Sequence, residues 1–196
     1  MSAGLHRSDL RADPLDQFRA WFAEAERAVE TPEAMALGTA GPSVRMVLLK
    51  GADEGGFTFY TGYISRKAAE LDRDPRGALL FHWAPLGRQV RIEGPVERVP
   101  TEESDAYFAS RPRGAQLAAA ASRQSSVLES RDELEARVDE LRREHEGRDV
   151  PRPGHWGGYR LKPDTYEFWQ HRDDRMHDRF RYRSEGGGWV VERLSP

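Results

Sequence analysis

Residues 156–183 read WGGYRLKPDTYEFWQHRDDRMHDRFRYR. Within this stretch, residues 156–161, 166–169 and 180–183 alternate apolar with polar side chains, and residues 189–193 continue the pattern. Such alternation is typical of antiparallel strands that bury one face and expose the other. The end of the chain therefore predicts four antiparallel strands.

The upstream half adds a helix and further strands. Asp13 and Pro14 provide an N-cap and a first-turn proline. Apolar residues follow at helical spacing, at Leu15, Phe18, Phe22, Ala25 and Val29. Runs with strand character, separated by turn residues, lie at residues 34–39, 44–50, 57–60, 78–83 and 89–99.

Three more helices are predicted from their start signals. Ser65 can cap a short helix that ends at Asp74-Pro75, Thr101 starts a second, and Ser130 opens a capping box with Glu133 that starts a third. Helices combined with antiparallel strands predict an α+β fold, in which an antiparallel sheet curls into a barrel with peripheral helices.

Length and composition limit the kind of protein. The chain has 196 residues, which suits a single domain at residues 13–196, preceded by a polar arm at residues 1–12 that we expect to be mobile. The net charge of -3 argues against nucleic acid or an anionic membrane as a partner. Cysteine is absent and the histidines lack metal-ligand spacing, so no bound metal is expected. No apolar run reaches membrane-spanning length, and we expect a soluble, cytoplasmic protein.

The final third also carries candidate binding residues. Trp169, Arg175, His177 and Arg179 place an aromatic plane, two guanidinium groups and an imidazole close together in sequence. These groups are suited to holding a flat, anionic, heteroaromatic ligand.

Two basic segments upstream have two interpretations each. Arg45 and Lys50 flank a strand and could each bind an anion, or they could simply extend into water. Arg66 and Lys67 lie in the first turn of a predicted helix, where cations oppose the helix dipole. An anion bound at that helix end would explain them, and two solvated basic residues on a surface helix are the alternative.

Two polar segments in the middle of the chain are also ambiguous. Tyr107 and Arg111 lie four residues apart, on one face of a helix that Pro112 ends, and could grip a phosphate or could be an ordinary stacked pair. Gln124 and Ser125 offer polar side chains in a turn-like setting that is also typical of helix caps.

These motifs stand together in the order seen in pyridoxamine 5'-phosphate oxidases, and the chain closely resembles that family from about residue 13 to its end. The motifs are residues 45–50, 59–61, 65–67 and 88–90, Tyr107-Phe108 with Arg111-Pro112, Gln124-Ser125, and residues 156–158, 167–170 and 175–179. The resemblance implies an FMN-binding split barrel that forms a homodimer, with two FMN molecules at the subunit interface.

The resemblance also implies roles for individual residues. From one subunit, the implied FMN contacts are Arg45, Met46, Val47, Leu48, Leu49, Lys50, Tyr60, Thr61, Arg66 and Lys67, completed by Gln124 and Ser125. From the partner, they are Gln89, Trp169 and Arg179. The implied substrate-binding residues are Lys50, Tyr107, Arg111 and Ala115 around the phosphate, and Arg175, Met176 and His177 over the pyridine ring, with Arg175 and His177 as the candidate catalytic residues.

The implied activity is oxidation of pyridoxine or pyridoxamine 5'-phosphate to pyridoxal 5'-phosphate, with dioxygen as acceptor and hydrogen peroxide as product. Ala115 departs from the family, because members commonly have a serine there that donates to the substrate phosphate. Two alternatives stay open: a related flavin oxidase of the phenazine-biosynthesis type, and a protein that binds FMN or pyridoxal phosphate without turnover.

Overall fold

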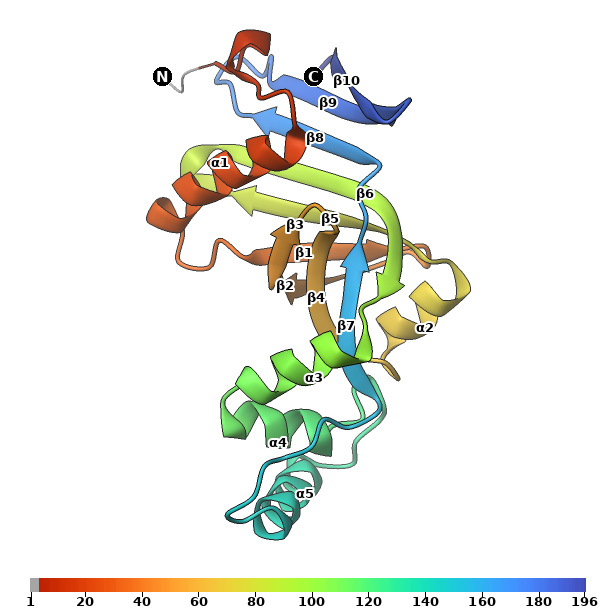
Figure 1. The fold of residues 1–196 in the computed structure, drawn as a ribbon. Helices are drawn as coiled ribbons and strands as arrows, with labels where there is room; N and C mark the ends of the chain where they lie inside the picture. The colour runs from red at the N-terminus through yellow and green to blue at the C-terminus, as the bar shows by residue number, and fades with distance from the viewer. Residues whose placement is uncertain (1–3) are drawn as a thin grey trace.

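A computed structural model describes residues 4–196, which form an antiparallel sheet with helices around it (Figure 1). The strands are β1 (Ala34–Thr39), β2 (Ser43–Leu48), β3 (Gly51–Asp53), β4 (Gly56–Gly62), β5 (Arg76–Trp83), β6 (Arg88–Arg98), β7 (Trp156–Leu161), β8 (Thr165–Gln170), β9 (Asp178–Glu185) and β10 (Gly188–Arg193). The helices are α1 (Pro14–Ala28), α2 (Arg66–Arg73), α3 (Thr101–Ser110), α4 (Arg113–Ala121) and α5 (Arg131–Glu144), with short 3-10 turns η1 (Arg7–Asp9) and η2 (Ala84–Leu86).

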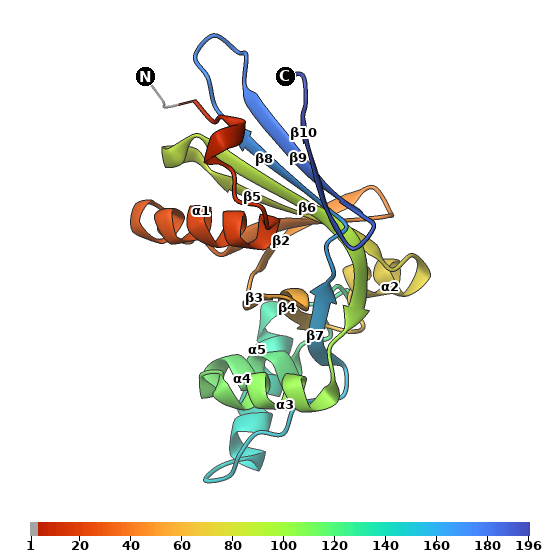
Figure 2. The ribbon, with the colours of Figure 1, turned by 45° about the horizontal axis from the view of Figure 1, so that its top comes forward.

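The long strand β6 makes the sheet curl. Its first half pairs with β8 and its last residues pair with β7, while β5 runs along its other edge. The change of partner occurs at Gly94, where a Cβ atom would lie 1.9 Å from the carbonyl oxygen of Lys162. Only glycine allows this approach of the two backbones, so Gly94 divides the sheet into a β8–β10 part and a β3–β4–β7 part (Figures 1 and 2).

Helix α1 covers the concave side of the sheet and fills the main core. Asp13 caps the helix by accepting a hydrogen bond from the backbone N–H of Leu15 (2.7 Å), as predicted. Phe18 packs edge-on against Phe57 of β4, with ring centroids 4.8 Å apart, and Trp21 packs edge-on against Phe168 of β8, at 5.3 Å. The apolar stripe of α1 therefore joins both parts of the curled sheet.

Helices α3, α4 and α5 form a separate group beyond β4 and β7, far from β9 and β10 in both views (Figures 1 and 2). A second apolar cluster of Phe108, Leu117, Val150 and Trp156 attaches them to β7. These helices, together with β2 and β4, surround a cavity of about 770 Å³.

The predicted α+β fold and curled antiparallel sheet are confirmed, with three local differences. The short strand β3 was not predicted, β2 ends at Leu48 rather than at residue 50, and α4 restarts directly after Pro112. None of the helices in residues 4–196 is long and apolar enough to cross a membrane.

Residues 1–3 of the predicted mobile arm lie outside the described part. The rest of the arm runs beside β9 and β10, where the N–H of Leu5 donates to Asp178 (3.0 Å) and the hydroxyl of Tyr182 donates to the carbonyl of Arg11 (2.7 Å). The mobility of the arm stays a prediction.

Candidate functional site

A cavity of about 770 Å³ opens between β2, β4 and helices α2 to α5. Two predicted sets, the FMN contacts from one subunit and the residues around the substrate phosphate, are together called the first group. The cavity brings most of them together, namely Arg45, Met46, Val47, Leu48, Lys50, Tyr60, Thr61, Lys67, Tyr107, Arg111, Ala115 and Gln124. The other lining residues were not predicted, and they are Gly62, Ala118, Ala119, Ser122, Leu134 and Trp156. Residues separated by more than 100 positions in sequence thus line one hollow of a size typical of ligand sites.

Three predicted residues of the first group lie beside this cavity rather than in it. Arg66 and Ser125 line an adjoining hollow that shares Gln124 with the main cavity. Leu49, the residue after β2, is buried and lines a different hollow beside α1. Ser125 has a left-handed backbone, with φ of 73°, which is uncommon for a residue other than glycine and occurs often at functional sites.

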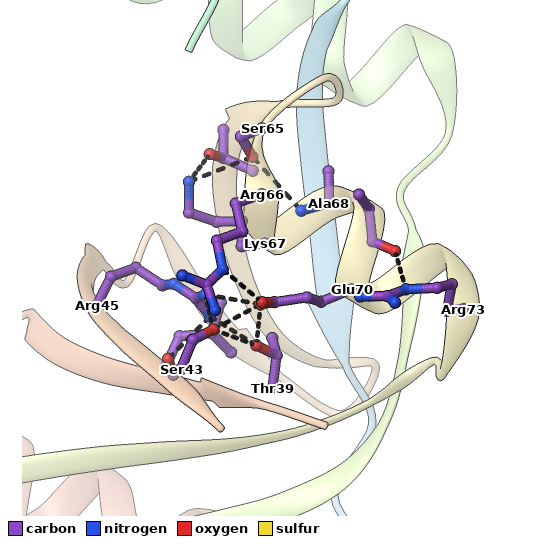
Figure 3. A network of polar contacts seen from close by, with 12 residues as sticks. Thr39, Ser43, Arg45, Ser65, Arg66, Lys67, Ala68, Glu70 and Arg73 are labelled. Carbon is purple, nitrogen blue, oxygen red and sulfur yellow. Dashed lines mark hydrogen bonds and ion pairs between the residues drawn. The ribbon is translucent and has the colours of Figure 1, made fainter. Parts of the chain in front are cut away.

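We call Arg45, Arg66 and Lys67 the cation cluster (Figure 3). Lys67 is only 7% exposed, and its ammonium group donates to Thr61 (3.0 Å), Gln124 (3.1 Å) and Ser65 (3.3 Å). Burial, together with the positive charge of Arg45, lowers the pKa of Lys67. Lys67 is therefore not a solvated surface residue, whereas the side chain of Arg66 is 68% exposed.

Glu70, which was not among the predicted residues, lies beside the cation cluster (Figure 3). Its carboxylate accepts hydrogen bonds from Thr39, Ser43, Arg45 and Arg66. Hydrogen bonds from these four donors hold the pKa of Glu70 well below its usual range, and the two hydroxyl groups contribute most to this lowering. Glu70 could have been predicted from its position four residues after Arg66, because residues four apart lie on the same face of a helix.

An aromatic wall stands on another side of the cavity. The rings of Tyr60 and Tyr107 are stacked with centroids 3.9 Å apart, and Trp156 stacks 5.6 Å from Tyr60. Burial, with a further contribution from nearby Glu103, raises the pKa of Tyr60 to about 12. Both tyrosines therefore present neutral hydroxyl groups at ordinary pH.

Arg111 follows the end of α3 and lies over this wall, with its guanidinium carbon 4.6 Å from the centroid of Trp156. Its Nη1 atom is buried without a hydrogen-bond partner in the described residues. A buried guanidinium nitrogen with no acceptor is costly, and an anionic ligand in the cavity would satisfy it. Arg111 and Tyr107 thus both line the cavity, and their chemistry suits an anionic ligand, whose binding there stays a prediction.

The remaining predicted residues, which we call the second group, lie on β6, β8, β9 and the loop between β8 and β9. These residues are Gln89, Trp169, Arg175, Met176, His177 and Arg179, and none of them lines the cavity of its own chain. Figure 1 shows β8 and β9 at the opposite end of the molecule from α3 and α4. One chain therefore carries two separated halves of the predicted site.

Side-chain contacts within the sheet hold several residues of the second group in place. Glu167, which is buried, accepts hydrogen bonds from Arg179 (2.8 Å) and Arg91 (2.8 Å). The rings of Trp169 and His177 have centroids 4.7 Å apart. These contacts fix the orientation of three predicted residues on one side of the sheet.

The loop between β8 and β9 carries the two predicted catalytic residues. Arg175 has a φ of 64°, a left-handed conformation that costs energy outside glycine and often accompanies function. His177 accepts a hydrogen bond at Nδ1 from the backbone N–H of Arg172 (3.1 Å). The loop thus holds His177 in one orientation and leaves its Nε2 atom for another partner.

The chain is similar to known sequences over most of its length. Residues 22–144 match the family model for pyridoxamine 5'-phosphate oxidase, and residues 156–196 match that for the pyridoxine 5'-phosphate oxidase C-terminal dimerisation region. The chain is 57% identical to a pyridoxine/pyridoxamine 5'-phosphate oxidase of Rubrobacter xylanophilus, over 99% of this chain and 92% of the relative. It is 54% identical to one of Salinibacter ruber, over 99% and 94%.

Two solved structures have the same fold. PhzG from Burkholderia lata 383, in complex with tetrahydrophenazine-1-carboxylic acid, matches with a TM-score of 0.90 and 32% identity over 98% of both chains. A pyridoxamine 5'-phosphate oxidase-related, FMN binding protein from Nostoc punctiforme matches with a TM-score of 0.73 and 15% identity, over 94% of this chain and 98% of that protein.

Proposed function

The chain belongs to the pyridoxamine 5'-phosphate oxidase family, and on this basis we propose that it is an FMN-dependent oxidase of pyridoxine and pyridoxamine 5'-phosphate. The product would be pyridoxal 5'-phosphate, with hydrogen peroxide formed from dioxygen and ammonia released from the amine substrate. FMN, when bound, supplies the acceptor for the hydride leaving the 4' carbon. The cytoplasmic location stays a prediction.

The chemistry of the cavity supports an anionic flavin and a phosphorylated substrate. The cation cluster suits a phosphate dianion, which needs several donors in fixed positions. The unpartnered Nη1 of Arg111 suits a second phosphate, carried by the substrate. Because these two anion-binding features are separate, one cavity can hold a phosphorylated cofactor and a phosphorylated substrate together.

The protein's part in the reaction is to bind and orient. Aromatic and cationic side chains hold the two ring systems in contact so that the donor carbon faces the flavin. Arg175 would cover the outer face of the substrate ring, and His177 would form a hydrogen bond with a ring substituent. Neither residue has to remove a proton in this scheme.

A homodimer would join the two separated halves of the site. The match of residues 156–196 to a dimerisation region supports this proposal. So does the edge strand β2, which exposes three apolar side chains in a row, Val44, Met46 and Leu48. In such a dimer, each site takes its cavity from one subunit and its β8–β9 loop from the partner.

Mixing two inactive variants tests the shared site. Arg111→Leu damages the cavity half and Arg175→Ala damages the loop half, so a heterodimer of the two has one intact site and one doubly damaged site. After unfolding and refolding together in equal amounts, we expect about a quarter of wild-type activity, because about half of the dimers are mixed. The same variants mixed after folding serve as the control. No recovery in a refolded mixture shown to contain heterodimers would contradict the shared site.

The similarity to PhzG favours one alternative, an oxidase that acts on a different ring system on the same scaffold. That alternative does not need the anion site at Arg111 to be filled by a substrate phosphate. A protein that binds FMN or pyridoxal phosphate without turnover is the other alternative.

An absorbance experiment tests the proposed function. We expect the purified protein to show a flavin spectrum that bleaches when pyridoxine 5'-phosphate is added without oxygen, and to release hydrogen peroxide when air is admitted. Bleaching by a reduced phenazine precursor but not by pyridoxine 5'-phosphate would support the PhzG-like activity. Absence of bleaching with either compound would support a binding protein.

A further inference from the structure

Glu70 occupies the centre of a polar network that joins α2 to β1 and β2 (Figure 3). It is 4% exposed, and both carboxylate oxygens are used. Oε2 accepts from Thr39 (2.6 Å), Ser43 (2.7 Å) and Arg45 (2.8 Å), and Oε1 accepts from Arg66 (2.8 Å). One carboxylate therefore fixes the guanidinium groups of two residues that come from different elements.

The charges around Glu70 are unbalanced without a ligand. Among residues 4–196, Glu70 is the carboxylate that forms ion pairs with Arg45 and Arg66. Lys67, by contrast, donates to the neutral oxygens of Thr61, Ser65 and Gln124. The cation cluster and Glu70 together carry two excess positive charges, which is close to the charge of about -1.5 to -2 on a phosphate monoester.

We propose that Glu70 is a positioning residue, which holds Arg45 and Arg66 ready for the cofactor phosphate and supplies their counter-charge while no phosphate is bound. The proposal rests on the proposed FMN cofactor. Without Glu70, the buried Lys67 and the mostly buried Arg45 would lie close together, with the exposed Arg66 beside them and no anion between them. A bound phosphate would restore the missing negative charge.

A purely structural role is the competing explanation. Glu70 also accepts hydrogen bonds from Thr39 and Ser43, and these contacts connect α2 to the start and end of a turn between two strands. Loss of those contacts would destabilise the protein equally with or without ligand. The two explanations therefore differ in how the stability of a variant depends on phosphate.

Glu70→Gln removes the charge while keeping the shape of the side chain. We expect the melting temperature of the cofactor-free variant to fall by roughly 5 to 10 °C relative to the cofactor-free wild type. With saturating FMN, the two proteins should melt within about 2 °C of each other, because the phosphate replaces the lost charge. Riboflavin, which has the same ring system without the phosphate, should leave the deficit, and inorganic phosphate at high concentration should reduce it.

Glu140→Gln is the matched control, because Glu140 undergoes the same chemical change at an exposed position on α5. Equal deficits with FMN, with riboflavin and without ligand would overturn the proposal in favour of the structural role, and so would a variant as stable as wild type. If Glu70→Gln does not fold without a ligand, it is refolded with FMN and with riboflavin, and equal yields of folded protein with the two compounds overturn the proposal. A wild-type protein that FMN fails to stabilise would instead refute the proposed cofactor, and the inorganic phosphate measurements would still test Glu70.

Discussion

Arg111→Leu is expected to lower kcat/KM for pyridoxine 5'-phosphate about 100-fold, since a charge-assisted contact of about 3 kcal/mol to the substrate phosphate is lost. The buried Nη1 atom of Arg111 has no acceptor in the described residues, so its partner is expected to be a ligand. Leucine can still pack against Trp156, and it removes the donors together with the charge that lies over the ring. Steady-state kinetics with both substrates measure the effect.

Unphosphorylated pyridoxine provides the internal comparison for this prediction. Because it has no phosphate for Arg111 to bind, its oxidation should change little, and the preference for the phosphorylated form should shrink by the same factor of about 100. Arg142→Leu, at an exposed position on α5, controls for the loss of one arginine. An equal loss with both substrates would assign Arg111 a structural role.

The fold could be predicted from sequence where local patterns repeat. The alternation in β7 to β10 has a period of two, and the cap of α1 at Asp13 is a local signal. The strand β3 has only three residues, too few to show a period. The helix α4 was missed because Pro112 ends α3 and α4 begins at the next residue without a side-chain cap, so the usual start signal is absent.

The site could be predicted in part, because individual residue types indicate their chemistry but not their neighbours. The burial of Lys67 depends on Gln124, which is 57 residues away. The contact between Glu70 and Thr39 spans 31 residues. No local pattern encodes such contacts, and they form only when the sheet curls at Gly94 and α2 packs against β1.

Arg175→Ala and His177→Ala are expected to leave the flavin spectrum of the holoprotein unchanged while lowering kcat/KM by roughly 100-fold and 10-fold or more, respectively. In the proposed site both residues contact the substrate ring rather than the flavin, so cofactor binding should not require them. Absorbance at the flavin maximum measures cofactor content, and peroxide release measures turnover. Arg183→Ala, on β9, is the control.

The backbone of Arg175 calls for a second variant at the same position. Arg175 has a φ of 64°. Alanine at this position would keep the strain of the left-handed backbone, whereas glycine would remove it. Arg175→Gly should therefore fold at least as stably as Arg175→Ala and should be equally slow if the guanidinium is what acts. If Arg175→Gly kept wild-type turnover, the side chain would have no part in the reaction.

The hydrogen bonding of His177 allows two possible roles of this residue to be distinguished, hydrogen-bond donor and general base. Because Nδ1 accepts from the N–H of Arg172, the neutral ring carries its proton on Nε2, which can then donate to a substrate oxygen. Glutamine can place an N–H donor near the same point but cannot accept a proton. His177→Gln should therefore keep roughly 10-fold more activity than His177→Ala if donation is the role. Equal loss in the two variants would indicate instead that the imidazole acts as a base.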